Sequence, residues 1–83
     1  MRLWEVLYAL GFEPVYPNCP GLQMYKGTFV VVNTFQQKTG CYICRGKNEK
    51  LFIPYTLRCV VKQEAISPLE KEVKHFIVSS ELD

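Results

Sequence analysis

The four cysteines are the residues of this chain best suited to metal or redox chemistry. Cys41 and Cys44 have the C-x-x-C spacing with which two thiolates reach one tetrahedral zinc ion, and Cys19 and Cys59 complete a candidate set of ligands. The pair Tyr42-Ile43 favours a strand, where residues three apart point to opposite faces of a sheet. We therefore expect free thiols, no metal ligands and no cofactor, and keep structural zinc as the less favoured alternative.

A second chemical signal is positive charge, which is concentrated in the middle of the chain. Residues 36–62 contain six basic side chains against one acidic side chain, Glu49, whereas residues 63–83 contain five acidic and two basic ones, and the formal net charge is +2. Basic side chains contact phosphates without sequence preference, and interleaved aromatic rings stack on unpaired bases. We predict a nucleic-acid-binding surface formed by Lys38, Arg45, Lys47, Lys50, Arg58 and Lys62, with Tyr25 and Tyr42 as stacking residues.

Acid–base catalysis has few candidate residues in this sequence. The single histidine, His75, is expected on the last helix, on the side away from Val73 and Ile77, where we interpret it as a solvated side chain. Glycines occur singly at expected turns rather than in a phosphate-binding loop, and no serine has the context of a nucleophile elbow. We predict no catalytic residues. A ribonuclease that uses His75 as its general base is the enzymatic alternative.

Length and composition predict one folded domain over residues 1–83. A chain of 83 residues with 48 % hydrophobic and 13 % aromatic residues is unlike a disordered segment, which is poor in aromatic residues. No apolar run approaches the ~18 residues of a membrane span. The apolar start of the chain is interrupted by Glu5 and followed by Gly11 rather than by a cleavage site, so it does not resemble a secretory signal. We expect a cytoplasmic protein with reduced cysteines and no membrane contact.

The spacing of apolar residues predicts a helix at the start of the chain and then a series of strands. Leu3, Leu7 and Leu10 share one helical stripe. Gly11 suits the left-handed position that ends a helix, and Phe12 suits the hydrophobic contact that accompanies it. Residues 12–16, 22–26, 28–33, 41–45 and 50–53 are expected to be extended, with turns at Lys26-Gly27 and at residues 46–49.

Two further helices are predicted to end the chain. Apolar residues from Leu57 to Ala65 keep a helical period, and they place Arg58 and Lys62 one turn apart on another face. The sequence Ser67-Pro68-Leu69-Glu70 has the pattern of a capping box and predicts the start of the last helix. The predicted fold is α+β: an N-terminal helix, a three- to four-stranded antiparallel sheet and two C-terminal helices. The order is α-β-β-β-β-α-α, with the helices on one face of the sheet.

Two stretches share their residue pattern with a known family. Residues 7–15 (LYALGFEPV) and 53–67 (IPYTLRCVVKQEAIS) cover less than a third of the chain. They resemble the first helix and the threonine-leucine-arginine helix of HicA, a family of small toxin mRNA interferases with a fold like a double-stranded-RNA-binding domain. The family's catalytic glycine-serine-histidine falls at Gly21-Leu22-Gln23, and an insertion spans roughly residues 34–50. Because glutamine cannot shuttle protons, the resemblance implies a helix–sheet–helix scaffold with RNA affinity, and it does not imply cleavage.

We predict a small non-enzymatic binding module that contacts nucleic acid, RNA more than DNA, through its central basic surface. The alternative is a protein–protein interaction module, such as a phage or viral host-modulating protein or a toxin–antitoxin-type regulator. In that alternative the partner binds to the sheet or to the acidic last helix, and the complex survives reversal of the basic charges.

Overall fold

The first helix, α1 (Leu3–Ala9), ends as the sequence predicts. The computed structural model describes residues 1–34 and 40–81. Gly11 has a φ of +98°. Its amide donates to the carbonyl oxygen of Tyr8 (3.1 Å), and the amide of Phe12 donates to that of Leu7 (3.0 Å). These two bonds form a Schellman cap, in which glycine takes the left-handed conformation that a Cβ disfavours.

Five antiparallel strands form one sheet in the described residues, ordered as they occur in the chain. They are β1 (Glu13–Pro14), β2 (Gln23–Lys26), β3 (Phe29–Asn33), β4 (Cys41–Arg45) and β5 (Glu49–Ile53). The prediction of three to four strands is too low, because the very short β1 still pairs with β2 despite its proline. An edge strand tolerates proline, since one side of its backbone has no partner.

α2 (Gln63–Glu81) is the only helix after the sheet in residues 40–81, where the sequence predicts two. The predicted capping box is wrong, because Ser67 and Pro68 lie inside this helix rather than at its start. Val73 and Ile77 belong to its buried stripe, as their spacing predicts. Neither helix of the described residues is long and apolar enough to cross a membrane.

The chain between β5 and α2 is not helical, so the predicted helix from Leu57 to Ala65 is wrong over residues 57–62. The amides of Leu3 and Trp4 donate to the carbonyl oxygens of Cys59 and Leu57 (2.9 and 3.0 Å). These oxygens therefore satisfy the first turn of α1 instead of accepting bonds from a local helix.

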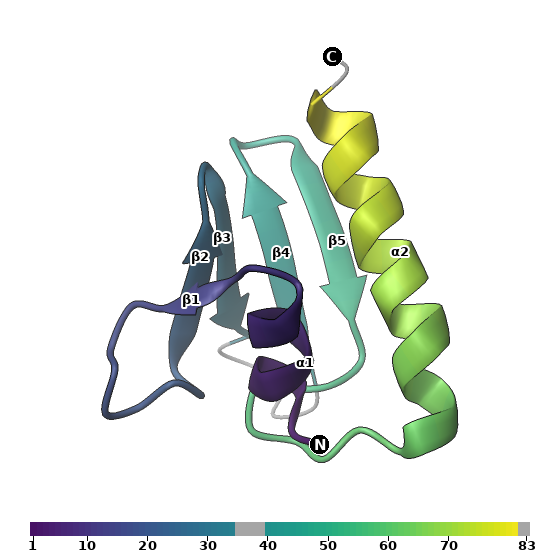
Figure 1. Ribbon diagram of the computed structural model, residues 1–83. Coiled ribbons are helices and arrows are strands. Elements are labelled where there is room, and N and C mark those ends of the chain that lie inside the picture. Colours follow the sequence, from purple (N-terminus) through teal and green to yellow (C-terminus); the bar gives the residue numbers. More distant parts are fainter. Residues whose placement is uncertain (35–39, 82–83) are drawn as a thin grey trace.

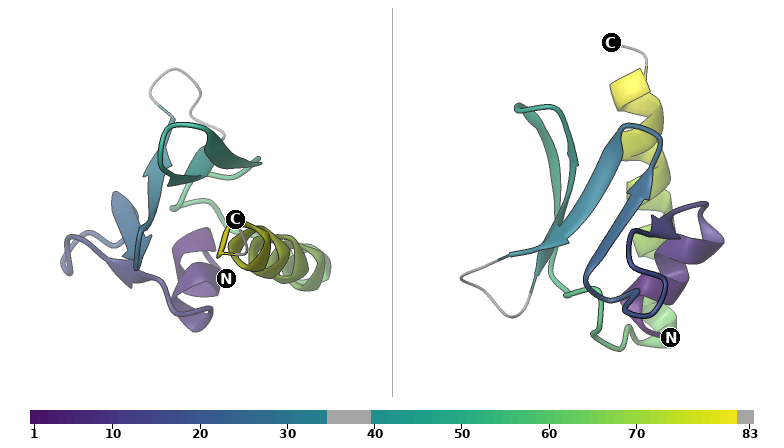
Figure 2. Two further views of the ribbon diagram at one scale, coloured as in Figure 1. Left: turned by 90° about the horizontal axis from the view of Figure 1, so that it is seen from above. Right: turned by 90° about the vertical axis from the view of Figure 1, so that its left-hand side faces the viewer.

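Both helices lie on one face of the sheet and enclose the core there (Figure 1; Figure 2). Alternate strand residues point into this layer, and Met24, Val31 and Ile43 are fully buried on three adjacent strands. They pack in one cluster with Leu7 from α1 and Val73 from α2. No helix of the described residues covers the opposite face, so the side chains on that face meet solvent.

Candidate nucleic-acid interface

The sheet face opposite the helices carries a row of exposed apolar and aromatic side chains. We call this surface the open face, and its residues are Gln23, Tyr25, Val30, Val32, Tyr42, Cys44, Lys50 and Phe52. Val32, Tyr42 and Phe52 are direct cross-strand neighbours on β3, β4 and β5, and they are 39 %, 38 % and 41 % exposed. A contiguous apolar row of this kind marks an interaction site more often than singly scattered residues do.

Tyr42 and Phe52 form an aromatic pair on the open face. Their ring centroids are 5.2 Å apart, and the ring planes are tilted by 59°. The Phe52 ring covers Gly40, where an added Cβ would lie 2.6 Å from two ring carbons. Because Gly40 has no side chain, Phe52 packs closely against the start of β4, while both rings of the pair remain partly exposed.

Tyr25, the other predicted stacking residue, also lies on the open face, but β3 separates it from Tyr42. Its hydroxyl donates to Glu13 Oε2 at 3.3 Å. The structure therefore brings both predicted tyrosines to one face. Sequence reasoning missed Phe52, although the alternation along β5 and the hairpin with β4 together place it beside Tyr42.

Two of the predicted cations lie near the aromatic pair. Lys50 is on the open face, two residues before Phe52 in β5 and opposite Cys44 in β4. Lys47 is exposed in the turn that joins the two strands. Neither lysine has a hydrogen bond or ion pair with another described residue, so both ammonium groups are available to an external anion.

Arg45 faces the helix layer instead of the open face. Its Nη1 donates to the carbonyl oxygen of Ser80 in the last turn of α2. Its guanidinium also lies over the Phe29 ring, 5.6 Å from the ring centroid. A cation at a helix C-terminus interacts favourably with the last carbonyl groups, and one above a ring interacts with its π-face. Arg45 therefore stabilises the contact between α2 and the sheet.

The remaining predicted cations do not join Lys47 and Lys50. Arg58 and Lys62 are exposed in the segment between β5 and α2, at the lower end of the sheet in Figure 1. Lys38 lies outside the described residues. β5 carries the chain from one end of the sheet to the other. The basic residues of the predicted nucleic-acid surface are therefore divided between the β4–β5 hairpin and the opposite end of the sheet.

The four thiols are free in the structure. Cys41 is fully buried on the helix side of β4, and this burial raises the pKa of its thiol to about 12, with smaller contributions from Cys59 and Cys44. Cys44 lies on the opposite face of the same strand, and Cys19 is exposed in the loop before β2. No group of three or more Cys, His, Asp or Glu side chains in residues 1–34 and 40–81 is placed to hold a metal ion.

His75 is exposed on α2, where its Nε2 lies 3.4 Å from Ser79 Oγ. The HicA resemblance places its catalytic histidine at Gln23, and Gln23 lies on the open face beside Val32.

Comparison of the chain with protein-family models, curated proteins and solved structures finds no match. The relationship to the HicA family therefore stays a proposal from two short stretches of sequence. We base the functional proposal on the geometry of the open face.

Proposed function

We propose that the protein is a non-enzymatic module that binds single-stranded nucleic acid, RNA in particular, on its open face. The observation that carries this proposal is the exposed Tyr42–Phe52 pair, on a sheet face that no described helix covers. Unpaired bases stack on such rings whatever their sequence, and each stacked base contributes about 1–3 kcal/mol. Single-stranded RNA presents its bases in this way, whereas a duplex hides them in its stack.

The lysines of the β4–β5 hairpin would contact the phosphates of the bound strand. Lys50 and Phe52 point to the same side of β5, about 7 Å apart along the strand, so a backbone whose base stacks on Phe52 passes near Lys50. Lys47 extends the positive charge to the tip of the hairpin. Tyr25 offers a further ring on the other side of β3. Arg58 and Lys62 lie at the lower end and are outside this path.

Binding without cleavage is the proposed activity. The side-chain amide of Gln23 is not basic near neutral pH, so it cannot act as the general base of a ribonuclease. His75 is on α2, and α2 lies on the opposite side of the sheet from the proposed strand path.

Fluorescence anisotropy of a labelled oligouridine tests the role of the aromatic pair. Tyr42→Ala and Phe52→Ala should each weaken binding about 5- to 150-fold, the equivalent of one lost stacking contact. Tyr8→Ala removes an exposed ring from α1 and is the matched control, with unchanged affinity expected. Equal losses in all three variants would show that the open face has no special role.

The salt dependence of the same titration tests the lysines. The slope of log affinity against log salt should become shallower by about 0.7 in Lys50→Gln, the contribution of one phosphate contact on a single strand. Lys71→Gln, which changes an exposed lysine of α2, is the control. If the unmodified protein fails to bind oligouridine even at low salt, the proposal is wrong.

A protein partner is the second candidate for this surface, because Val32, Tyr42 and Phe52 also form the apolar patch that a protein interface needs. Reversal of charge at Lys47 and Lys50 to glutamate separates the two candidates. It should abolish RNA binding, but a protein that packs on the apolar row would still bind. A purified complex that survives the double reversal, together with no oligouridine binding, would favour the protein partner.

A further inference from the structure

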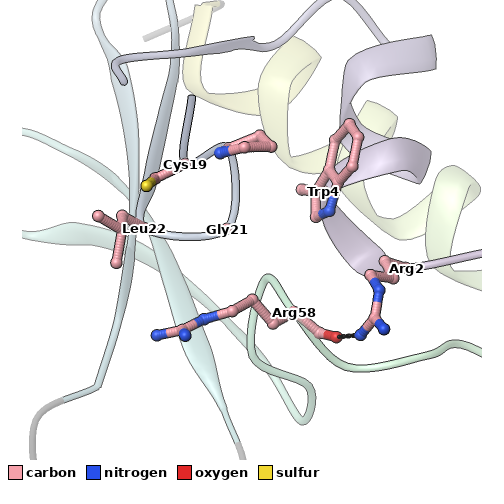
Figure 3. Close-up of a pocket in the computed structure, with 7 residues that line it drawn as sticks. Arg2, Trp4, Cys19, Gly21, Leu22 and Arg58 are labelled. Carbon is pink, nitrogen blue, oxygen red and sulfur yellow. Dashed lines mark hydrogen bonds between the residues drawn. The ribbon is translucent and has the colours of Figure 1, made fainter. Parts of the chain in front are cut away.

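A pocket at the lower end of the molecule lies outside the open face and has its own chemistry. Its volume is about 380 Å³, and its lining includes Arg2, Trp4, Pro20, Gly21, Leu22 and Arg58. Figure 3 shows Arg2 and Trp4, from the start of α1, on one side of this pocket, and Cys19, Gly21 and Leu22 on the other. Three segments far apart in the sequence therefore form its walls.

Hydrogen bonds join these three segments into one assembly. The side chain of Asn33 donates from Nδ2 to the carbonyl oxygen of Gly21 (2.9 Å) and accepts from the amide of Leu57 at Oδ1 (2.8 Å). Arg2 Nη1 donates to the carbonyl oxygen of Arg58. The walls are thus positioned before any ligand arrives, which lowers the entropic cost of binding.

The groups that line the pocket favour an anion. Arg2 and Arg58 both line it, and no described aspartate or glutamate does. Their guanidinium groups point apart in Figure 3, so each offers a separate contact to an anion. Arg58 donates no side-chain hydrogen bond to any described residue. Guanidinium groups carry five N–H donors, so Arg2 also keeps donors beyond the one that binds Arg58. Arginine recognises the phosphate group with paired hydrogen bonds.

An aromatic ring accompanies the positive charge. Trp4 is half-buried in α1 and its indole lines the same pocket. The side-chain stem of Arg58 lies close over Gly21, where an added Cβ would be 2.2 Å from Arg58 Cγ. Indole and guanidinium planes are the side-chain surfaces on which nucleobases stack.

We propose that this pocket binds a nucleotide 5′-monophosphate, with the phosphate on the guanidinium of Arg58 and the base against Trp4. The same chemistry is offered by a free mononucleotide and by the 5′-phosphorylated end of an RNA strand. Because the pocket does not use the open face, nucleotide binding here is independent of strand binding at Tyr42 and Phe52.

Fluorescence of Trp4, the single tryptophan of the chain, reports binding directly. Uridine 5′-monophosphate should quench this fluorescence and bind at least tenfold more tightly than uridine or inorganic phosphate. Arg58→Gln should weaken the binding on the order of tenfold or more, the effect of losing one charge-assisted contact. Lys71→Gln is the control and should leave it unchanged. Thermal unfolding of each variant confirms that it is folded.

Gly21→Ala provides a second test that keeps both arginines. The new methyl group would displace the stem of Arg58, so this variant should also bind the nucleotide less tightly. Phe52→Ala should bind it normally, and this separates failure of the pocket from failure of the open face. No quenching by the nucleotide, or equal affinity for inorganic phosphate or uridine, would overturn the proposal.

Competition with short oligonucleotides distinguishes the two sources of the ligand. If a strand end is the ligand, a 5′-phosphorylated oligouridine should displace the mononucleotide better than its 5′-hydroxyl counterpart does. Equal displacement by the two, with the mononucleotide still bound through Arg58, would assign the pocket to free nucleotides.

Discussion

Burial on the helix side of β4 changes the chemistry of the Cys41 thiol. Its thiol is fully buried on the helix side of β4, and its pKa is raised from 9.0 to about 12 chiefly by loss of hydration. A thiol that stays protonated is a poor nucleophile and a poor metal ligand. Cys19, by contrast, is exposed. We therefore expect thiol-alkylating reagents to modify Cys19 in the folded protein long before Cys41.

The raised pKa of Cys41 also predicts a pH dependence of stability. The folded state holds the proton more tightly than the unfolded state, so the stabilisation is complete below pH 9.0 and is lost as the pH rises toward 12. Between about pH 8 and pH 10.5 the free energy of unfolding should fall by about 2 kcal/mol more than in Cys41→Ala. Urea denaturation of both proteins at the two pH values measures this difference. Parallel pH profiles would show that the thiol ionises equally in both states.

Asn33 links two loops through one side chain, and its removal should be costly. Asn33→Ala leaves the Gly21 carbonyl and the Leu57 amide without their partner. The free energy of unfolding should fall by about 2 kcal/mol, because each such group loses a bond in a partly buried place. Asn48→Ala, in the exposed β4–β5 turn, is the control and should change stability little. A loss of equal size in both variants would contradict the linking role of Asn33.

At the scale of elements, the start of α2 is the clearest difference between expectation and structure. The sequence Ser67-Pro68 predicts a helix start, yet α2 begins at Gln63 and continues through both residues. In the segment that precedes α2, the carbonyl oxygens of Leu57 and Cys59 accept hydrogen bonds from the first turn of α1. Apolar periodicity alone does not reveal such a use of backbone groups, since it reports side chains only.

Two substitutions test where α2 begins. Inside a helix, Pro68→Ala restores a backbone donor and should raise the free energy of unfolding by up to about 3 kcal/mol. Ser67→Ala should be neutral or slightly stabilising, because alanine has the better helix propensity. Urea denaturation gives both values. If Ser67→Ala instead costs about 1 kcal/mol, Ser67 caps the helix and α2 begins there.

At the scale of the whole molecule, the charged side chains of the described residues do not pair with one another. No ion pair joins a described Lys or Arg to a described carboxylate. The free energy of unfolding should therefore change by less than about 1 kcal/mol between low and high salt. The proposed affinity for RNA should fall steeply over the same range. A free energy of unfolding that changes strongly with salt would show that charge pairing stabilises the fold, and would contradict this prediction.

The amino-acid sequence by itself determined the features that depend on close neighbours. The glycine cap of α1, the boundaries of β4 and the opposite faces of Cys41 and Cys44 each follow from residues a few positions apart. Such features need only local sterics and the strand period.

Only the tertiary structure decided which side chains meet. It turned Arg45 toward α2 and joined Arg2 to the carbonyl of Arg58 across 56 positions. The direction of the basic side chains depended on how β5 and the following loop cross the molecule. Contacts at long sequence separation arise from packing of whole elements, and no local pattern in the chain specifies them.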